Sequence, residues 1–363
     1  MSAEPDSIDQ VVAVLRSATA AETVLPVGAR TKPRLSDVKT AKLICLRKLT
    51  GVTGYEPSEF TFTALAGTPV KEIQQLLLEN GQYLPFDPMF VDAGATLGGT
   101  VAAGMSGAGQ FRFGGVRDFL LGVRLVTGDG QLISAGGKVV KNAAGFDIPR
   151  LMVGSLGRLG TIVEMTFKVF PNSETRKTVS VACASHEQAI DRLGSAASAP
   201  WELDAIDYRP AEKLLLLRIA SARHVAQSLV DRAVEFFGED AASLPPERAE
   251  QLWRDAGELA WAPSGAIVVK VPTTPRQFLE LHRSISGLDS YLSAGGATLW
   301  LAFESSSILQ EVDSVLDRMK LGGLVIRGDT PSVRLGHWHE PKVTRAIQIA
   351  MDPANRFPDI CTQ

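Results

Sequence analysis

The chain has 363 residues, of which 45% are hydrophobic and 21% charged, and its formal net charge is −3. This length exceeds one ordinary hydrophobic core, so we expect two domains. A slightly acidic chain offers no basic field for nucleic acid. No run of eighteen apolar residues is present, which excludes a membrane-spanning helix. The composition therefore predicts a two-domain globular protein with no nucleic-acid partner and no membrane span.

The N-terminus and the cysteines indicate a cytoplasmic setting. Residues 1–10, MSAEPDSIDQ, lack a basic segment followed by an apolar one, so we expect no signal peptide. Cys45, Cys183 and Cys361 are scattered and form no C-x-x-C motif, which predicts neither a disulfide framework nor a zinc or iron–sulfur site. Any iron–sulfur clusters needed for electron transfer would belong to another chain.

The first ninety residues alternate helical and strand patterns. Apolar residues between Ile8 and Leu15 recur at helical spacing and predict a helix over 7–19. Thr68 is the expected N-cap of a second helix over 68–82, with Pro69 at its first position and Gly81 after its end. Short apolar runs predict strands over 24–27, 43–46 and 60–65.

Glycine is concentrated in one stretch: 17 of the 33 glycines lie between Gly94 and Gly160. Glycine costs conformational entropy on folding, so such a density indicates tight turns or backbone lying close to a ligand. Residues 92–109, DAGATLGGTVAAGMSGAG, leave main-chain N–H groups little covered by side chains. We therefore expect this segment to face a long, flat, anionic ligand.

Three familiar explanations of the glycines fail. Residues 99–106 are spaced like a P-loop, but Met105 stands where the phosphate-binding lysine should be. No G-x-G-x-x-G lies between a strand and a helix, so a Rossmann site is not supported. A ligand-free β-solenoid or barrel would need a repeat period, and the sequence has none.

Strand patterns follow the first glycines. Residues 116–126 predict a strand, Gly128-Asp129-Gly130 a hairpin turn, and Leu132 and Ile133 a return strand. Glycines between 154 and 160 then lead into a β-branched strand over 161–169, which ends before Pro171.

Four motifs follow one another in this part of the chain: GATLGGTVAAG, VRDFLLGVRLVTGDG, KNAAGFDIPRLMVGS and GRLGTIVEMTFKV. In this order they resemble the FAD-binding domain of the vanillyl-alcohol oxidase and p-cresol methylhydroxylase superfamily, and within it the flavin-binding subunits of bacterial glycolate oxidases. Each motif alone is weak, because glycine-rich turns occur in many folds. Their common order makes the resemblance specific.

The resemblance implies an α/β (α+β) fold. It assigns residues 1–172 to a two-part FAD-binding domain of the p-cresol methylhydroxylase type, 173–345 to a ferredoxin-like, mixed-sheet cap, and 346–363 to a tail returning towards the flavin domain. Patterns in the cap predict two βαβ-like sets, with helices on one face and loops at 244–246 and 262–265. The expected strands are 178–182, 203–208, 214–219, 266–271, 298–303 and 324–327, and the expected helices are 187–199, 225–237, 276–286 and 308–321.

The resemblance also implies FAD as the cofactor. The first pyrophosphate loop, 27–33, keeps Gly28 alone of a run that is richer in glycine in relatives, so an exposed basic turn is the alternative. It contains no histidine, which predicts non-covalent binding. The expected FAD-binding residues are Pro26, Gly28, Ala29, Arg30, Thr31, Thr96, Gly98, Gly99, Ala102, Ser106, Gly107, Gly157, Gly160 and Ile162.

Catalytic residues cannot be assigned from the cap. Relatives that oxidise 2-hydroxy acids use an H-G-D-x-x-x-H cluster, which this chain lacks. The sequence His337-Trp338-His339-Glu340 is its one histidine cluster, and without a third ligand we predict no metal site. We favour a solvated or interfacial turn before the final helix, with a catalytic role of the cluster as the alternative. His186, His224 and His282 are expected on helix surfaces.

The last residues depart from the pattern of the relatives. Residues 350–358, AMDPANRFP, resemble a D-P-x-x-x-x-N-P-G tail that closes over the flavin. The asparagine before the last proline is missing, and Asp359 replaces the glycine. These changes put tail contacts with the isoalloxazine in doubt.

The resemblance therefore implies an FAD-binding oxidoreductase subunit of a glycolate oxidase (glycolate dehydrogenase) complex, which converts glycolate, a small 2-hydroxy acid, to glyoxylate. Its partners would be a larger catalytic flavoprotein and an iron–sulfur subunit, in the cytoplasm or held at the inner membrane through those partners. Two alternatives stay open: a stand-alone FAD-dependent 2-hydroxy-acid dehydrogenase, and a non-catalytic assembly subunit that has kept only the fold.

Overall fold

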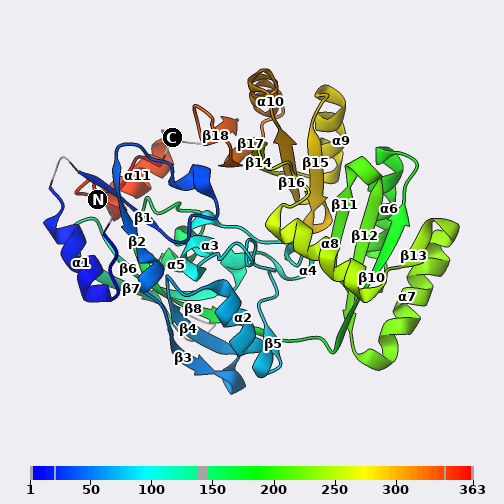
Figure 1. Ribbon diagram of the computed structural model, residues 1–363, viewed down its shortest axis with the longest axis horizontal. Coiled ribbons are helices and arrows are strands. Elements are labelled where there is room, and N and C mark those ends of the chain that lie inside the picture. Colours follow the sequence, from blue (N-terminus) through cyan, green and yellow to red (C-terminus); the bar gives the residue numbers. More distant parts are fainter. Residues whose placement is uncertain (1–2, 20–21, 138–145, 339–340, 361–363) are drawn as a thin grey trace. The chain divides into compact units, whose positions relative to one another are not determined.

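The structure is a computed structural model that describes residues 3–19, 22–137, 146–338 and 341–360. The chain forms two compact units (Figure 1). Unit 1 is drawn from residues 1–106, 115–172 and 339–363, and unit 2 from 107–114 and 173–338. The mixture of helices and sheets confirms the predicted fold class.

Unit 1 contains one parallel pair of strands, one antiparallel pair and one larger sheet. Its helices are α1 (Ile8–Ser17), α2 (Val70–Glu79), α3 (Leu97–Ala103), α5 (Ile148–Met152) and α11 (Pro341–Met351). Its strands are β1 (Thr23–Val27), β2 (Ala41–Cys45), β3 (Val52–Glu56), β4 (Thr61–Leu65), β5 (Gln82–Tyr83), β6 (Leu120–Val126), β7 (Leu132–Gly136), β8 (Thr161–Lys168) and β9 (Phe170–Pro171). β1 and β2 pair in parallel, and β5 pairs with β9.

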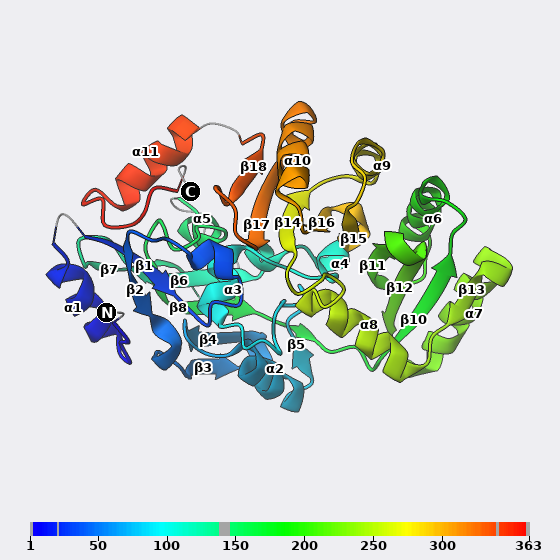
Figure 2. The ribbon, with the colours of Figure 1, turned by 45° about the horizontal axis from the view of Figure 1, so that its top comes forward.

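The larger sheet of unit 1 is antiparallel, with strand order β3-β4-β8-β6-β7. Buried aromatic rings pack beside it; Phe62 stacks on Phe167, with ring centroids 5.5 Å apart. The C-terminal helix α11 returns to the N-terminal elements of the same unit (Figure 2). There the N–H of Val24 donates to the carbonyl of Arg356 at 2.7 Å.

Unit 2 is built on one long sheet. Its helices are α4 (Gln110–Phe113), α6 (His186–Ser198), α7 (Arg223–Phe237), α8 (Pro246–Glu258), α9 (Pro275–Ser284) and α10 (Ser306–Arg318). Its strands are β10 (Thr175–Ala182), β11 (Leu203–Arg209), β12 (Leu214–Ser221), β13 (Ala241–Ser243), β14 (Ile267–Pro272), β15 (Asp289–Ser293), β16 (Thr298–Phe303), β17 (Gly322–Arg327) and β18 (Arg334–Gly336).

The sheet of unit 2 joins two repeats side by side. Its order is β13-β10-β12-β11-β15-β16-β14-β17-β18. The first repeat is β10-α6-β11-β12-α7-β13 and the second β14-α9-β15-β16-α10-β17, each with the strand order of a ferredoxin-like unit. This confirms the two predicted sets. The mixed sheet was a wrong detail, because the described strands pair antiparallel throughout.

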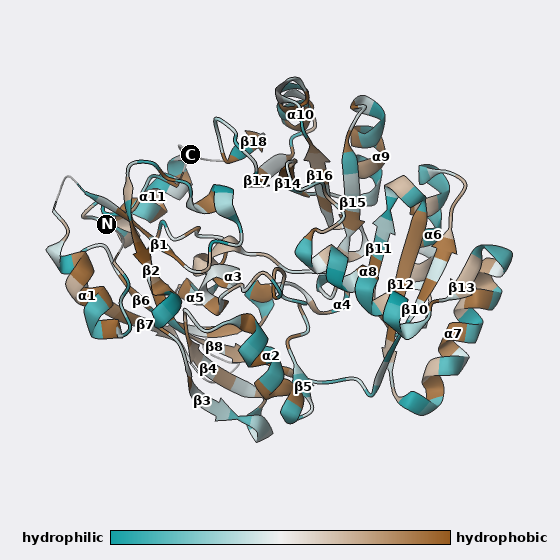
Figure 3. Ribbon diagram, in the orientation of Figure 1, coloured by the Kyte–Doolittle hydropathy of each residue, from teal (hydrophilic) through white to brown (hydrophobic). Residues whose placement is uncertain are grey.

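The core of unit 2 lies between this sheet and the helices of the repeats. Alternate strand residues, such as Val179 and Val181 of β10, are buried against α6, α7, α9 and α10. Strand β12 is largely apolar, as its brown ribbon shows (Figure 3). Helix α8 packs on β10 through Trp253, whose Nε1 donates to the Thr178 hydroxyl at 2.9 Å. Since Thr178 alternates with Val179, α8 lies on the opposite face.

Helix α2 begins later than predicted. Pro69 is its N-cap and Val70 its first residue, so the N-cap role predicted for Thr68 is wrong. The Thr68 hydroxyl is engaged elsewhere, because it donates to the carbonyl of Leu65 at 2.7 Å. Gly81 follows the helix with φ +64°, as expected of a residue after a helix end. The strand predicted from residue 116 begins only at Leu120.

No helix among the described residues combines the length and the apolarity needed to cross a bilayer. The motif KNAAGFDIPRLMVGS lies partly outside the described residues, since these resume at 146.

Replacing Gly194 with alanine should stabilise the fold. Gly194 is exposed within α6, and a Cβ there would meet nothing within 4 Å. Alanine exceeds glycine in helix propensity by about 1 kcal/mol, so urea denaturation should show a gain of about 0.5–1 kcal/mol. Gly98→Ala is the contrasting variant, because its Cβ would lie 2.9 Å from the carbonyl oxygen of Ala66. A gain in both variants would contradict this reading of the glycines.

Candidate functional site

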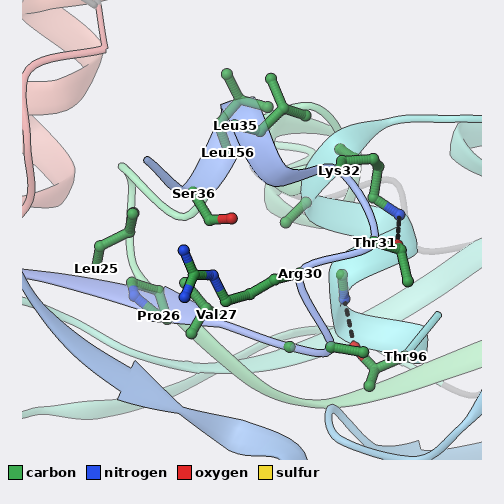
Figure 4. A pocket seen from close by; sticks show the side chains of 15 residues that line it. Leu25, Pro26, Val27, Arg30, Thr31, Lys32, Leu35, Ser36, Thr96 and Leu156 are labelled. Atoms are coloured by element: carbon green, nitrogen blue, oxygen red, sulfur yellow. Dashed lines mark hydrogen bonds between the residues drawn. The ribbon is translucent and has the colours of Figure 1, made fainter. Parts of the chain in front are cut away.

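A pocket in unit 1 lies between the end of β1, the loop that follows it and the start of α3 (Figure 4). A second pocket adjoins it and shares Val27, Gly28 and Gly99 with it, so we treat the two together as the β1–α3 pocket. Its lining residues are Leu25, Pro26, Val27, Gly28, Ala29, Arg30, Thr31, Lys32, Leu35, Ser36, Leu46, Ala66, Thr96, Gly98, Gly99, Ala102, Ala103, Leu156, Gly157, Gly160 and Ile162.

The β1–α3 pocket brings together three segments that the sequence analysis singled out separately. Twelve of the fourteen residues predicted to bind FAD line it, namely Pro26, Gly28, Ala29, Arg30, Thr31, Thr96, Gly98, Gly99, Ala102, Gly157, Gly160 and Ile162. Ser106 and Gly107 do not. The Ser106 hydroxyl accepts the N–H of Val116 at 2.9 Å, and Gly107 belongs to unit 2.

Apolar lining residues were missed, among them Leu46 and Ala66. Both directly follow a strand, β2 and β4 respectively, and these strands lie next to predicted site elements in their sheets. The only sign of these two lining residues in the sequence is that each stands at the end of a strand. Burial of these side chains against the glycine segments could not be read from composition.

Close packing explains the glycines of the pocket. A Cβ on Gly28 would lie 2.1 Å from Oγ1 of Thr96, so only glycine lets the loop after β1 approach the start of α3. Gly157 has φ +72°, and a Cβ there would come within 3.0 Å of the Pro26 ring. These contacts hold the three lining segments together.

The loop after β1 offers backbone donors to the pocket. The N–H groups of Ala29, Arg30 and Thr31 make no hydrogen bond to any described residue. Ala29 has no positive φ, whereas Arg30 is left-handed at φ +57°. By contrast, two N–H groups at the start of α3 already donate to other protein atoms. Gly98 N–H donates to the Ala66 carbonyl at 2.8 Å, and Gly99 N–H donates to Thr96 Oγ1 at 3.3 Å.

Two cationic side chains accompany these donors. Figure 4 shows the exposed Arg30 side chain running across the pocket towards Pro26. Lys32 is buried, donates from Nζ to the Thr31 hydroxyl at 2.9 Å and lies 5.0 Å from the centre of the Phe90 ring. No carboxylate is among the described lining residues. The loop is therefore the side of the pocket that suits an anion.

Only the first two residues of the histidine cluster 337–340 lie among the described residues. His337 Nδ1 lies 3.3 Å from Asp317 Oδ1, while His339 and Glu340 lie outside the described residues. In the part of the chain that the structure describes, no three His, Cys, Asp or Glu side chains are grouped as metal ligands. The role of the cluster stays a prediction.

Relatives of known name match about half of the chain. It is 40% identical over 166 residues to the glycolate oxidase subunit GlcE of Escherichia coli (strain K12), a match covering 45% of this chain and 47% of that protein. It is 31% identical over 210 residues to a D-2-hydroxyglutarate dehydrogenase of Xanthomonas citri pv. viticola, covering 56% of this chain and 43% of the relative. The matched segment thus spans less than half the length of each relative.

Similarity in fold to a solved structure extends over almost the whole chain. A solved structure of alkyldihydroxyacetonephosphate synthase superposes with a TM-score of 0.71 at 16% identity, covering 98% of this chain and 76% of that one. The family model of the FAD binding domain matches residues 1–136, which include the loop after β1 and all of α3. Residues 1–136 are thus similar to the FAD binding domain of flavoproteins.

Proposed function

We propose that the chain is the FAD-binding subunit of a multi-subunit glycolate oxidase, which oxidises glycolate to glyoxylate. The observation behind this proposal is the β1–α3 pocket, whose loop and helix lie inside the segment that matches the FAD binding domain. A relative is named as a glycolate oxidase subunit and another as a dehydrogenase of a 2-hydroxy acid, which supports this substrate class.

The pyrophosphate and the adenosine half of FAD would meet different parts of the pocket. The N–H groups of Ala29, Arg30 and Thr31 would hold the pyrophosphate, with Arg30 adding positive charge. Gly160 and Ile162 would lie along the adenosine half, where Ile162 offers a buried apolar side chain. The start of α3 would shape the wall, because the N–H groups of Gly98 and Gly99 are already used.

In such a complex, a flavin would accept the hydride that leaves the α-carbon of the hydroxy acid. Such a reaction also needs a base for the hydroxyl proton and a cation for the carboxylate. We propose that a larger catalytic flavoprotein supplies these groups and that an iron–sulfur subunit takes the electrons onward, so that this chain serves assembly or electron relay. The complex would lie in the cytoplasm or at the inner membrane.

Acid precipitation should release all of the flavin from the purified chain. The loop after β1 has no histidine, and no cysteine or histidine lines the pocket, so no described side chain there offers a usual attachment point for the isoalloxazine. The measurement is the visible spectrum of supernatant and pellet after trichloroacetic acid. Yellow colour retained by the pellet would contradict non-covalent binding, and a colourless preparation after saturation with FAD would contradict the proposed cofactor role.

A further inference from the structure

The boundary between the two repeats of unit 2 has little backbone pairing. Strands β11 and β15 meet there, and the described ladder joins them only at Tyr208 and Leu292. Within the second repeat, β14 and β16 pair from Ile267–Phe303 to Pro272–Thr298. The boundary, which we call the seam, therefore depends mainly on side chains.

Two histidines hold the seam on its helix side. His186 begins α6 of the first repeat, and His282 lies in the last turn of α9 of the second. Their rings are 4.1 Å apart between centroids, at 70° to each other. His186 Nδ1 also lies 2.7 Å from the hydroxyl of Tyr208. Both were predicted to be surface residues; that is wrong, because each is half-buried against the other.

Burial favours the uncharged form of this pair. It lowers the pKa of His186, which the neighbouring His282 lowers further, and it lowers the pKa of His282. Lys213 acts on His186 in the same direction, whereas Glu187 favours the charged form of both rings. Glu187 is itself paired with Arg283 at 2.6 Å. Since the folded-state pKa values are lowered, this contribution to stability is lost as pH falls through them.

Asp207 of β11 holds the other face of the seam. Its carboxylate is fully buried and accepts the Ser293 hydroxyl at 2.8 Å and the Ala294 N–H at 2.9 Å. Burial raises the pKa of Asp207 to about 6. The hydrogen bonds from Ala294 and Ser293 oppose this rise most, and Tyr291 and Arg218 oppose it less. A raised acid pKa contributes stability at low pH that is lost as pH rises through about 6, so Asp207 counteracts the histidines.

We propose that the seam is a proton-operated hinge, which opens when His186 and His282 take up protons. Two imidazolium rings in contact repel each other. With one backbone pairing at the seam, β11 and β15 then separate there while the rest of the shared core of unit 2 stays packed. Because Asp207 takes up its proton near pH 6, it opposes the opening over the same pH range.

Hydrogen exchange followed by mass spectrometry tests the hinge in the full chain. Peptides covering β11 and β15 are compared with one covering β16 at pH 7.5 and 5.5, after correction for the intrinsic exchange rate. We expect opening at the seam to increase on acidification by at most about tenfold for each histidine, because pH 5.5 lies about one unit below the ordinary histidine pKa. Protection of β16 should stay unchanged. Equal loss at β16 would show global unfolding and overturn the proposal.

Variants separate the two titrating groups. His186→Gln with His282→Gln should abolish the acid-induced opening, and Asp207→Asn should enlarge it, because the opposing group is removed. His224→Gln, an exposed histidine of α7, is the matched control and should behave as the parent. If the double variant does not fold, His282→Gln alone should reduce the opening. Acid-induced opening that persists in the folded histidine variants would overturn the proposal.

Discussion

Replacing Gly99 with valine should abolish FAD retention while the chain stays folded. Gly99 lines both parts of the β1–α3 pocket, and a Cβ there meets only Thr96 Oγ1, at 3.0 Å. The branched side chain would therefore occupy the space that we propose for the cofactor, without striking the backbone of another segment. Overpacking of this kind costs about 3 kcal/mol, which corresponds to a loss of affinity of roughly a hundredfold.

The measurement is a titration of the apoprotein with FAD, followed by quenching of flavin fluorescence, beside a circular dichroism spectrum. Gly194→Val is the matched control, since it makes the same change at a helical glycine with nothing within 4 Å of its Cβ. The control should bind FAD as the parent does. Equal affinity in Gly99→Val and the parent would place the FAD site elsewhere in the molecule.

The candidate pocket was largely predictable because its residues fall in short, distinctive segments. Gly99 and Gly160 stand in glycine-rich runs whose order along the chain resembles a known domain, whereas Gly28 stands alone in its loop. The structure gathers all three around one pocket. Ser106 and Gly107 belong to the same run but do not line it. The chain crosses into unit 2 at Gly107, and adjacency in sequence gives no sign of such a crossing.

The repeats of unit 2 were predictable from local periodicity, whereas strand pairing was not. The sequence pattern does not predict helix α8, for two reasons. Pro245-Pro246 suggests a loop, although proline is also common at the start of a helix. The helix also has few buried positions, with Ala249 and Leu252 among them. Strand β15, DSYLS, is polar because Tyr291 and Ser293 face Asp207 rather than an apolar core. The antiparallel order of the strands depends on contacts between segments that are far apart in sequence, which local periodicity does not show.

The histidine pair shows the same limit. His186 and His282 are far apart in sequence, and each stands in a helix whose pattern allows an exposed position. Only the pairing of the two repeats brings their rings together. A sequence pattern can place a residue on a helix face, but it does not show what packs on that face.

The purified chain, loaded with FAD, should not oxidise glycolate by itself. Hydride transfer needs a base, a carboxylate-binding cation and the flavin held within about one ångström of a productive geometry. The chain lacks the H-G-D-x-x-x-H cluster of its relatives, and the described residues contain no metal-ligand group in its place. His337 lies beside Asp317 on unit 2. A missing base and a missing cation each raise the barrier by several kcal/mol, which makes turnover undetectable.

Bleaching of dichlorophenolindophenol by glycolate measures this turnover. The chain alone should give no steady rate, and a rate should appear once a larger flavoprotein subunit and an iron–sulfur subunit are added. That rate should depend on this chain. If the flavin bound to this chain relays electrons, the rate with the parent chain should rise when FAD is added, and the rate with Gly99→Val should not. Steady bleaching by the chain alone, lost in His337→Ala or His339→Ala, would instead make it a stand-alone dehydrogenase with its active site at those histidines. A full rate from the partners without this chain would contradict its role as a subunit of the complex.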